Sequence, residues 1–235
     1  GPWAEELLGE AKPEVIYNTA TGFTADTFEQ VTAADPTQII AVNQAVDART
    51  KGSLEEIAPT TVKPNGYEDW QVPWEKQVET IAEAVGKEDE GDKLIDDTEK
   101  AFEEFRHEHA ELQDKSAAIV MPYDGKIGLY TKEDGRGQFI EDLGMEIPDA
   151  LQGDGGSFFV DIAPENYAKL NQVDYLFVLD YNGSSDALKK DKTFQGLDIV
   201  KNDRVRYLDT DTGNAMSMPN PVTIPWAVDK VEEKL

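Results

Sequence analysis

The 235-residue chain contains no cysteine and only two histidines, His107 and His109. Disulfides, zinc–thiolate centres and thiol nucleophiles are therefore excluded. The two imidazoles stand two positions apart, so on a helix they face different directions, and neither pairs with an obvious nucleophile. The sequence also lacks the motifs of a serine nucleophile elbow and of a phosphate-binding loop. This inventory disfavours an enzyme.

Cations are scarce as well, because 22 Lys and Arg face 48 Asp and Glu, which gives a net charge of −26. So acidic a surface repels phosphates, which argues against nucleic acid and anionic membranes as partners. No apolar run approaches the ~18–20 residues that span a bilayer. We therefore expect no nucleic-acid binding and no membrane insertion by this segment.

Apolar patterns in the first part of the chain predict alternating strands and helices. Strands are expected at 13–17 and 38–43, and helices at 26–34, 49–58 and 74–85. This alternation is typical of a mainly parallel sheet covered by helices.

Residues 87–113 are densely charged, yet their apolar residues recur at helical spacing. They predict one long surface helix with a single buried stripe. About 22 residues of helix reach roughly 33 Å, a length that suits a strut between two lobes. We therefore predict a first lobe at 1–86, an interlobe helix at 87–113 and a second lobe at 114–235.

The second lobe repeats the α/β pattern. Strands are expected at 116–122, 127–131, 174–180 and 205–208, and helices at 138–143, 164–170, within 185–200 and at 222–235. The run Asp209 to Asn214 resembles the start of a calcium loop but lacks its closing acid, so we predict a turn there. The expected fold is bilobal, with two α/β sandwich lobes joined by a long rigid helix.

Aromatic residues gather near predicted strand ends, where open α/β sheets bind ligands, although half or more would pack the cores. In the second half, those near predicted strand ends or loops are Tyr123, Tyr130, Phe158, Phe159, Tyr181 and Trp226. In the first half, a loop and a helix start, where a core role is not required, hold Tyr67, Trp70 and Trp74. Arg136 stands between two glycines at a predicted helix start. A helix N-terminus and a guanidinium both favour anionic ligand oxygens, whereas a lone loop arginine is otherwise a solvated charge.

Several motifs together resemble the class III periplasmic-type binding proteins, the substrate-binding components of iron-siderophore ABC importers. In the first half they are Trp3–Leu7, Phe28–Val31, Asp35-Pro36 before Ile39-Ile40, and Leu54–Thr60. In the second half they are Tyr123–Gly125, Gly128–Thr131, Arg136-Gly137, Pro164-Glu165 and Ile224–Ala227. The resemblance covers essentially the entire chain.

The resemblance implies a non-enzymatic protein without a cofactor that binds a ferric siderophore between its lobes and delivers it to an ABC permease. A rigid interlobe helix implies only a small closure on binding. Family members begin with a lipidated cysteine and a further strand-helix-strand, which this sequence does not contain. We therefore expect a truncated first lobe and a lipid-anchored protein outside the cytoplasm, at the cell surface or in the periplasm.

The resemblance also assigns roles to residues. The positions that match ligand contacts are Tyr123, Tyr130, Arg136 and Phe158, followed by Trp74, Asn43, Met216 and Trp226. Glu29 and Glu165 match the glutamates that contact permease arginines. From the residues alone, these two are also explained as first-turn acids placed favourably on helix dipoles.

The scarcity of cations bears on the ligand. Ferric hydroxamates are neutral or cationic and suit an acidic, aromatic-lined cleft better than strongly anionic catecholates do. Haem and cobalamin remain alternatives within the class, and haem would need an axial His, Tyr or Met. A chelatase-like enzyme and an adhesion protein without a small ligand are the rival functions.

Overall fold

The structure is a computed structural model of residues 1–235, and it describes all of them except 12, 14, 17–21 and 154–155. The chain divides into two compact units. Unit 1 comprises Gly1–Ala4 and Leu94–Leu235, and unit 2 comprises Glu5–Lys93. The boundary falls inside the long helix α5 (Glu88–Glu108).

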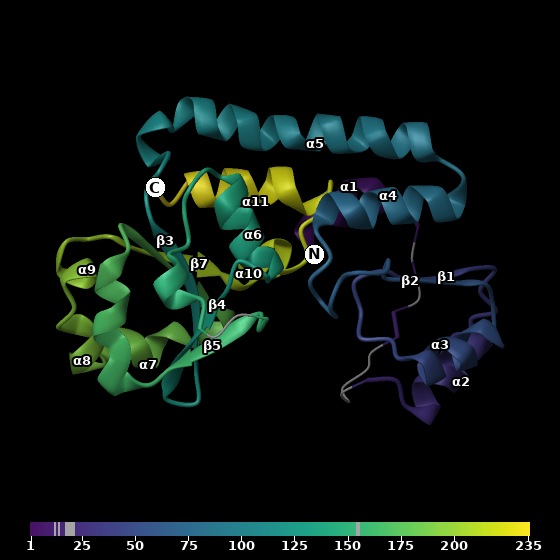
Figure 1. Ribbon diagram of the computed structural model, residues 1–235, viewed down its shortest axis with the longest axis horizontal. Coiled ribbons are helices and arrows are strands. Elements are labelled where there is room, and N and C mark those ends of the chain that lie inside the picture. Colours follow the sequence, from purple (N-terminus) through teal and green to yellow (C-terminus); the bar gives the residue numbers. More distant parts are fainter. Residues whose placement is uncertain (12, 14, 17–21, 154–155) are drawn as a thin grey trace. The chain divides into compact units, whose positions relative to one another are not determined.

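Unit 1 is built on a five-stranded sheet of order β5-β4-β3-β6-β7 (Figure 1). The strands are β3 (Ala117–Tyr123), β4 (Lys126–Tyr130), β5 (Phe159–Ile162), β6 (Tyr175–Asp180) and β7 (Val205–Asp209). Strands β3, β6 and β7 are parallel, whereas β4 and β5 extend the sheet in antiparallel fashion. The sheet is therefore mixed, with a hairpin at one side.

Helices cover both faces of this sheet (Figure 1). One face carries α6 (Gly135–Asp142), α10 (Thr210–Ser217) and α11 (Thr223–Glu232). The other face carries the 3₁₀ segment Pro164–Gln172, α7 (Ser185–Lys190), α8 (Lys192–Gln195) and α9 (Asp198–Lys201). Further short 3₁₀ turns are Pro2–Ala4, Ala110–Leu112, Asp149–Leu151 and Tyr181–Gly183.

The core of unit 1 follows the alternation of side chains along the central strands. Val120 and Val178 belong to the buried cluster that includes Phe194 on the side of α8. Ile119 and Phe177, their neighbours in sequence, are equally buried and point to the opposite face. The central strands are thus apolar on both sides, as parallel strands covered by two helical layers must be.

Unit 2 holds a smaller sheet of two parallel strands, β1 (Ile39–Ala41) and β2 (Thr60–Val62). Its helices are α1 (Glu5–Leu8), α2 (Ala25–Ala33), α3 (Ala48–Glu55), α4 (Trp74–Val85) and the start of α5. Gly86 ends α4 in the left-handed conformation, with φ of 69°, which glycine adopts without strain. Gly91 of α5 lies so near Ala82 that a Cβ at position 91 would stand 2.5 Å from the Ala82 Cβ.

The α/β class and most predicted elements are confirmed, with shifts of a few residues at their ends. Strands β2 and β5 were not predicted, because both are short and lack clear alternation. Of the predicted strand at 13–17, residues 14 and 17 lie outside the described residues, and the described residues 13, 15 and 16 belong to no strand. The prediction of two sandwich lobes goes further than the structure, in which unit 2 contributes a two-stranded sheet.

The predicted turn over Asp209 to Asn214 is wrong, because this run begins helix α10. The Asp209 side chain caps the helix by accepting hydrogen bonds from the Thr212 backbone N–H and hydroxyl, both at 2.8 Å. An aspartate at the N-cap satisfies a backbone donor that the helix itself leaves unpaired. The acidic, glycine-containing pattern is therefore a capping signal.

Candidate ligand-binding site

Four aromatic rings lie together on strands β3 to β5 of unit 1 and in the segment that precedes β5. We call Tyr123, Tyr130, Phe158 and Phe159 the aromatic face. The ring centroid of Phe159 lies 5.5 Å from those of Tyr123 and Tyr130 and 6.2 Å from that of Phe158. These distances are typical of favourable aromatic pairs. Besides Arg136, unit 1 holds five predicted ligand contacts, and three of them, Tyr123, Tyr130 and Phe158, thus meet around Phe159.

Strand register brings the rings of Tyr123, Tyr130 and Phe159 onto one side of the sheet. Tyr130 of β4 stands opposite Phe159 of β5, and Gly128 stands opposite Met121 of β3. A Cβ at Gly128 would lie 2.0 Å from two atoms of the Phe159 ring and 3.0 Å from the Tyr123 ring. Glycine in the strand interior therefore lets the Phe159 ring lie directly over the backbone of β4.

Tyr123 is held at the β3–β4 hairpin. The two turn residues, Asp124 and Gly125, have φ of 46° and 74°, as tight hairpin turns require. Asp161 of β5 accepts hydrogen bonds from both the Tyr123 hydroxyl and the Lys126 ammonium. These bonds lower the pKa of Asp161, and the bond to Asp161 is the main cause that raises the pKa of Lys126. Strand β5 is thereby tied to the hairpin.

Arg136 lies beside Tyr130, in the first turn of α6. Asp134 caps this helix, and its Oδ1 accepts hydrogen bonds from the Arg136 backbone N–H and from Nη1, both at 2.9 Å. The guanidinium carbon stands 4.0 Å from the Tyr130 ring centroid, within the range of a cation–π contact. A Cβ at Gly137 would lie 2.0 Å from the Thr131 carbonyl oxygen, so this glycine permits α6 to start close to β4.

Burial sets the protonation of this cluster. It raises the pKa of Tyr130 to about 12, so the phenol stays neutral. Burial alone would lower the pKa of Arg136, but Asp134, Tyr130 and Tyr181 together raise it, so the guanidinium stays charged. Within the described residues, the Arg136 Nε and the Tyr181 hydroxyl are buried without a hydrogen-bond partner. The cluster thus holds one cation, Arg136, paired with the Asp134 carboxylate, and two buried polar atoms that make no hydrogen bond.

Chemically, this surface can stack flat or apolar groups and donate hydrogen bonds to oxygen atoms. Asp134 balances the charge of Arg136, so the surface offers donors without a net positive charge. Among the described residues, no group of three or more His, Cys, Asp and Glu is arranged to hold a metal ion. The arrangement is that of a binding surface.

Two other predicted contacts in unit 1 lie in different surroundings. Trp226, on α11, is partly buried and packs edge-on against Trp3 with centroids 5.3 Å apart. Met216, on α10, has no exposed surface. Met216 is thus part of the buried core of unit 1, and its role in ligand binding stays a prediction.

The predicted contacts in unit 2 are mostly buried. Trp74 is 1% exposed, although its predicted position at a helix start did not require a core role. The Asn43 side-chain oxygen accepts a hydrogen bond from the Val72 backbone N–H at 3.3 Å, which gives this asparagine a structural partner. The roles of Trp74 and Asn43 in ligand binding stay predictions.

The two predicted docking glutamates are both exposed. Glu165 lies in the first turn of the 3₁₀ segment Pro164–Gln172, as expected. Glu29 is the fifth residue of α2, whose first-turn acid is Asp26. Because Thr24 caps α2, the helix starts at Ala25 and Glu29 falls in its second turn. The description of Glu29 as a first-turn acid is therefore wrong. Their docking role stays a prediction.

Three residues that shape the site were not predicted: Gly128, Asp134 and Asp161. A glycine inside an apolar strand is a signal of close approach, and an aspartate before a helix start is a capping signal. Both could have been found in the sequence. Asp161 carries no local signal, because its partners Tyr123 and Lys126 lie on other strands and come close to it only when the strands pair.

Comparisons with known proteins agree with this fold. The family model described as periplasmic binding protein matches residues 6–212. No curated protein matches the sequence. Among solved structures, the PiaA protein of Streptococcus pneumoniae TIGR4 in complex with ferrichrome is 26% identical, with 99% of this chain and 78% of that chain covered and a TM-score of 0.81.

Two more solved structures are similar. A periplasmic solute binding protein from Mycobacterium smegmatis is 25% identical over 99% of this chain and 78% of its own, with a TM-score of 0.84. FhuD2 from Staphylococcus aureus with bound ferrioxamine B is 20% identical over 89% of this chain and 79% of its own, with a TM-score of 0.67, and shows the fold alone.

The family match covers most of the chain, so the chain belongs to the periplasmic binding protein family. This confirms the resemblance found in the sequence and the expectation of a binding protein instead of an enzyme. In the described part of the chain, no helix is both long and apolar enough to cross a membrane.

Proposed function

We propose that this chain is the solute-binding component of an ABC importer and that it captures a ferric siderophore of the hydroxamate type. The observation that carries the proposal is the aromatic face with a single, charge-balanced arginine, in a family member whose 26% identical relative was solved with ferrichrome. Haem and cobalamin, the alternatives within the class, become outcomes of the test below.

The chemistry of the face fits a neutral or cationic ferric complex. A hydroxamate shell presents iron-bound oxygens, which accept hydrogen bonds from a guanidinium. The Asp134 carboxylate cancels the attraction of Arg136 for strongly anionic groups, and the chain carries a net charge of −26. A tris-catecholate, which bears several negative charges, would meet repulsion at such a surface.

The wider arrangement follows the family. The proposed ligand lies between an N-terminal lobe at 1–86 and a C-terminal lobe at 114–235, joined by the helical segment 87–113. Trp74, Asn43 and Trp226 would then supply further contacts from their own elements. The protein would be held outside the cytoplasm by a lipid anchor upstream of this sequence.

Ligand titration tests the proposal. Tryptophan fluorescence is followed while ferrichrome, ferrioxamine B, a ferric catecholate, haem or cobalamin is added, with the iron-free siderophores as controls. We expect saturable quenching by a ferric hydroxamate. Loss of a hydrogen bond to a charged donor costs about 1.5–3 kcal/mol, so Arg136→Gln should weaken binding at least about tenfold. Arg49→Gln, at an exposed arginine of unit 2, is the matched control.

Three other outcomes would contradict parts of this proposal. Tighter binding of a catecholate, haem or cobalamin would contradict the hydroxamate assignment. Equal affinities of the Arg136→Gln and Arg49→Gln variants would remove Arg136 from the site. A folded chain that binds none of these compounds would contradict the siderophore role itself.

Docking to the permease is tested by uptake. If Glu29 and Glu165 pair with permease arginines, the double variant Glu29→Ala/Glu165→Ala should abolish siderophore uptake while its ligand affinity stays unchanged. The matched control replaces Glu103 and Glu108, two exposed acids of α5. Normal uptake by the docking variant would contradict this part of the proposal.

A further inference from the structure

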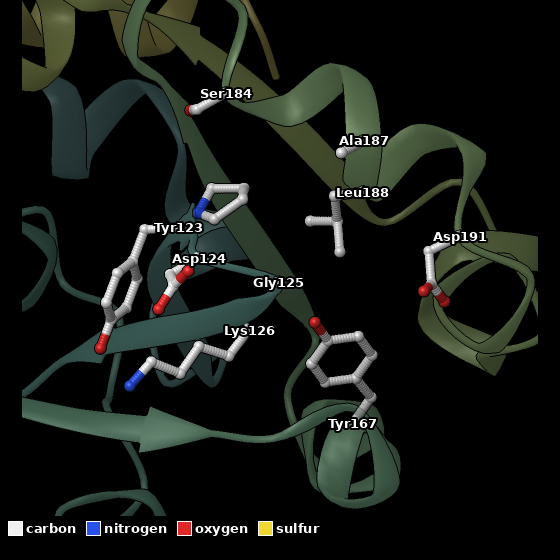
Figure 2. A pocket seen from close by; sticks show the side chains of 10 residues that line it. Tyr123, Asp124, Gly125, Lys126, Tyr167, Ser184, Ala187, Leu188 and Asp191 are labelled. Carbon is white, nitrogen blue, oxygen red and sulfur yellow. The ribbon is translucent and has the colours of Figure 1, made fainter.

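Met121 of β3 lies on the side of the sheet that carries the rings of the aromatic face. Side chains alternate along a strand, so Met121 points the same way as Tyr123, two residues further on. Figure 2 shows the Tyr123 side chain directed away from Tyr167 and Leu188, which stand on the other side of the hairpin. Met121 therefore belongs to the surroundings of the aromatic face.

Strand pairing places Met121 at the border between the covered and the open part of this side. Ile119, two residues earlier on β3, has no exposed surface, whereas Met121 is partly exposed. In the antiparallel pair, Met121 stands opposite Gly128, which has no side chain to cover it. The Met121 side chain thus lies where the core of unit 1 meets the candidate site.

The Met121 sulfur accepts a hydrogen bond from Tyr130. The Tyr130 hydroxyl donates to Met121 Sδ, and the two atoms are 3.6 Å apart. Tyr130 is 5% exposed, so its hydroxyl is largely cut off from water and depends on an acceptor within the protein. A thioether is a weak acceptor. Breaking this bond therefore costs less than breaking a bond to an amide or carboxylate oxygen.

The Tyr130 ring is held in place, but its hydroxyl proton is not. The Arg136 guanidinium carbon stands 4.0 Å from the ring centroid, and the Phe159 centroid stands 5.5 Å from it. Burial raises the pKa of Tyr130 to about 12, so the proton is present at every physiological pH. A hydroxyl proton rotates about the C–O bond to suit its acceptor. Tyr130 is thus a fixed ring whose hydroxyl can change acceptor.

We propose that Met121 is a positioning residue of the ligand site: its thioether holds the Tyr130 hydroxyl weakly, so that an iron-bound oxygen of the ligand can take that hydroxyl over. The inference rests on the proposed function, because a hydroxamate ligand brings such oxygens, whereas the pairing of Met121 with Tyr130 does not depend on the ligand. A stronger acceptor at position 121 would compete with the ligand for the same proton. An apolar side chain there would not.

The affinity for ferrichrome and for ferrioxamine B tests this role in two variants of the full chain. Met121→Gln offers an amide oxygen as the acceptor and should weaken binding about threefold to tenfold, which corresponds to one net hydrogen bond. Met121→Leu keeps the volume of the side chain but offers no acceptor, so it should bind at least as tightly as the wild type. Binding should therefore weaken in the order Leu, Met, Gln at this position.

A Tyr130→Phe background separates this effect from a change in packing. Phenylalanine keeps the ring and removes the hydroxyl, so Met121→Gln and Met121→Leu should bind the siderophore equally in this background. A weaker binding by Met121→Gln that persists without the Tyr130 hydroxyl would overturn the proposal, because it would come from packing alone.

Nuclear magnetic resonance of the full chain, isotope-labelled at the tyrosine Cζ atoms, tests the pairing without any ligand. The Tyr130 signal is identified by its absence from Tyr130→Phe, and its chemical shift reports the hydrogen bond of the hydroxyl. Met121→Gln and Met121→Leu should move this signal in the free protein, and ferrichrome should move it in the wild type. The signal of Tyr167, on the other side of the hairpin, is the matched control and should stay in place.

Each remaining outcome decides between the pairing, the positioning role and the proposed function. A Tyr130 signal that is the same in the wild type and both Met121 variants would overturn the pairing. Equal siderophore affinities of Met121→Gln and Met121→Leu, with Tyr130 intact, would overturn the positioning role and leave the proposed function standing. A chain that binds no siderophore, but whose Tyr130 signal responds to both Met121 variants, would contradict the proposed function and leave the pairing standing.

Discussion

The two units of this molecule differ most in how their sheets are covered. In unit 1, helices pack on both faces of five strands, and Ile119 and Phe177 have no exposed surface. In unit 2, the sheet has two short strands, Ile40 is 41% exposed, and α4 leaves Val85 45% exposed. Because stability follows buried apolar area, unit 1 is expected to hold the most stable part of the fold.

The largest effect on stability should come from an isoleucine-to-alanine change in unit 1, which is compared with the same change in unit 2. Ile119→Ala removes buried methyl groups from the centre of unit 1 and should cost about 2–5 kcal/mol. Ile81→Ala, on the exposed side of α4 at 37% exposure, should cost less than about 1 kcal/mol. Native-state hydrogen exchange, which reads the amides of each unit separately, measures both. Similar losses for the two variants would contradict the contrast between the units.

Replacing each of two glycines by alanine should change the free energy of unfolding in opposite directions. Gly128→Ala forces the Phe159 ring away from β4, because the new Cβ would lie 2.0 Å from it, and overpacking of this kind costs about 1–3 kcal/mol. Gly52→Ala, inside α3 with nothing within 4 Å of the new Cβ, should stabilise by about 0.5–1 kcal/mol.

The two glycine variants are compared by denaturant unfolding and by siderophore titration. Gly128→Ala should weaken ligand binding as well, because it displaces a ring of the aromatic face, whereas Gly52→Ala should leave affinity unchanged. An unaltered ligand affinity in Gly128→Ala would show that Phe159 does not shape the site.

The smallest effect on stability is expected at His109, which follows α5 and contacts Glu232 of α11. Burial tends to lower the pKa of His109, but its hydrogen bonds with Glu232, at 2.9 Å, and Glu111 raise it above the ordinary value. A raised folded-state pKa stabilises fully below the unfolded value of about 6.5, and this contribution is lost as the pH rises through the folded value. Such a pair contributes up to about 1 kcal/mol.

Unfolding of the wild type and of Glu232→Gln between about pH 6 and about pH 8 checks this contribution. The stability advantage of the wild type should shrink as the pH rises. An advantage that is constant across this range would indicate packing by Glu232 and not an ion pair.

Sequence patterns predicted most of unit 1 because its elements are long and strongly apolar. The strand predicted at 174–180 is β6, and the helix predicted at 74–85 has the bounds of α4. Short elements such as β2 were missed, because three residues carry too little pattern. In the site, ring type and strand position indicated Tyr123, Tyr130 and Phe158, but burial could not be foreseen for Met216.

By itself, the sequence determined the α/β class, the absence of thiol chemistry, the acidic surface and the family. These depend on composition, periodicity and local motifs, which are properties of neighbouring residues. Only the tertiary structure decided that Asp134 balances Arg136 beside the Tyr130 ring, that Asp161 ties Tyr123 and Lys126 together, and that Met216 is core. Their physical reason is strand pairing and helix packing, which bring residues together without any local signal in the chain.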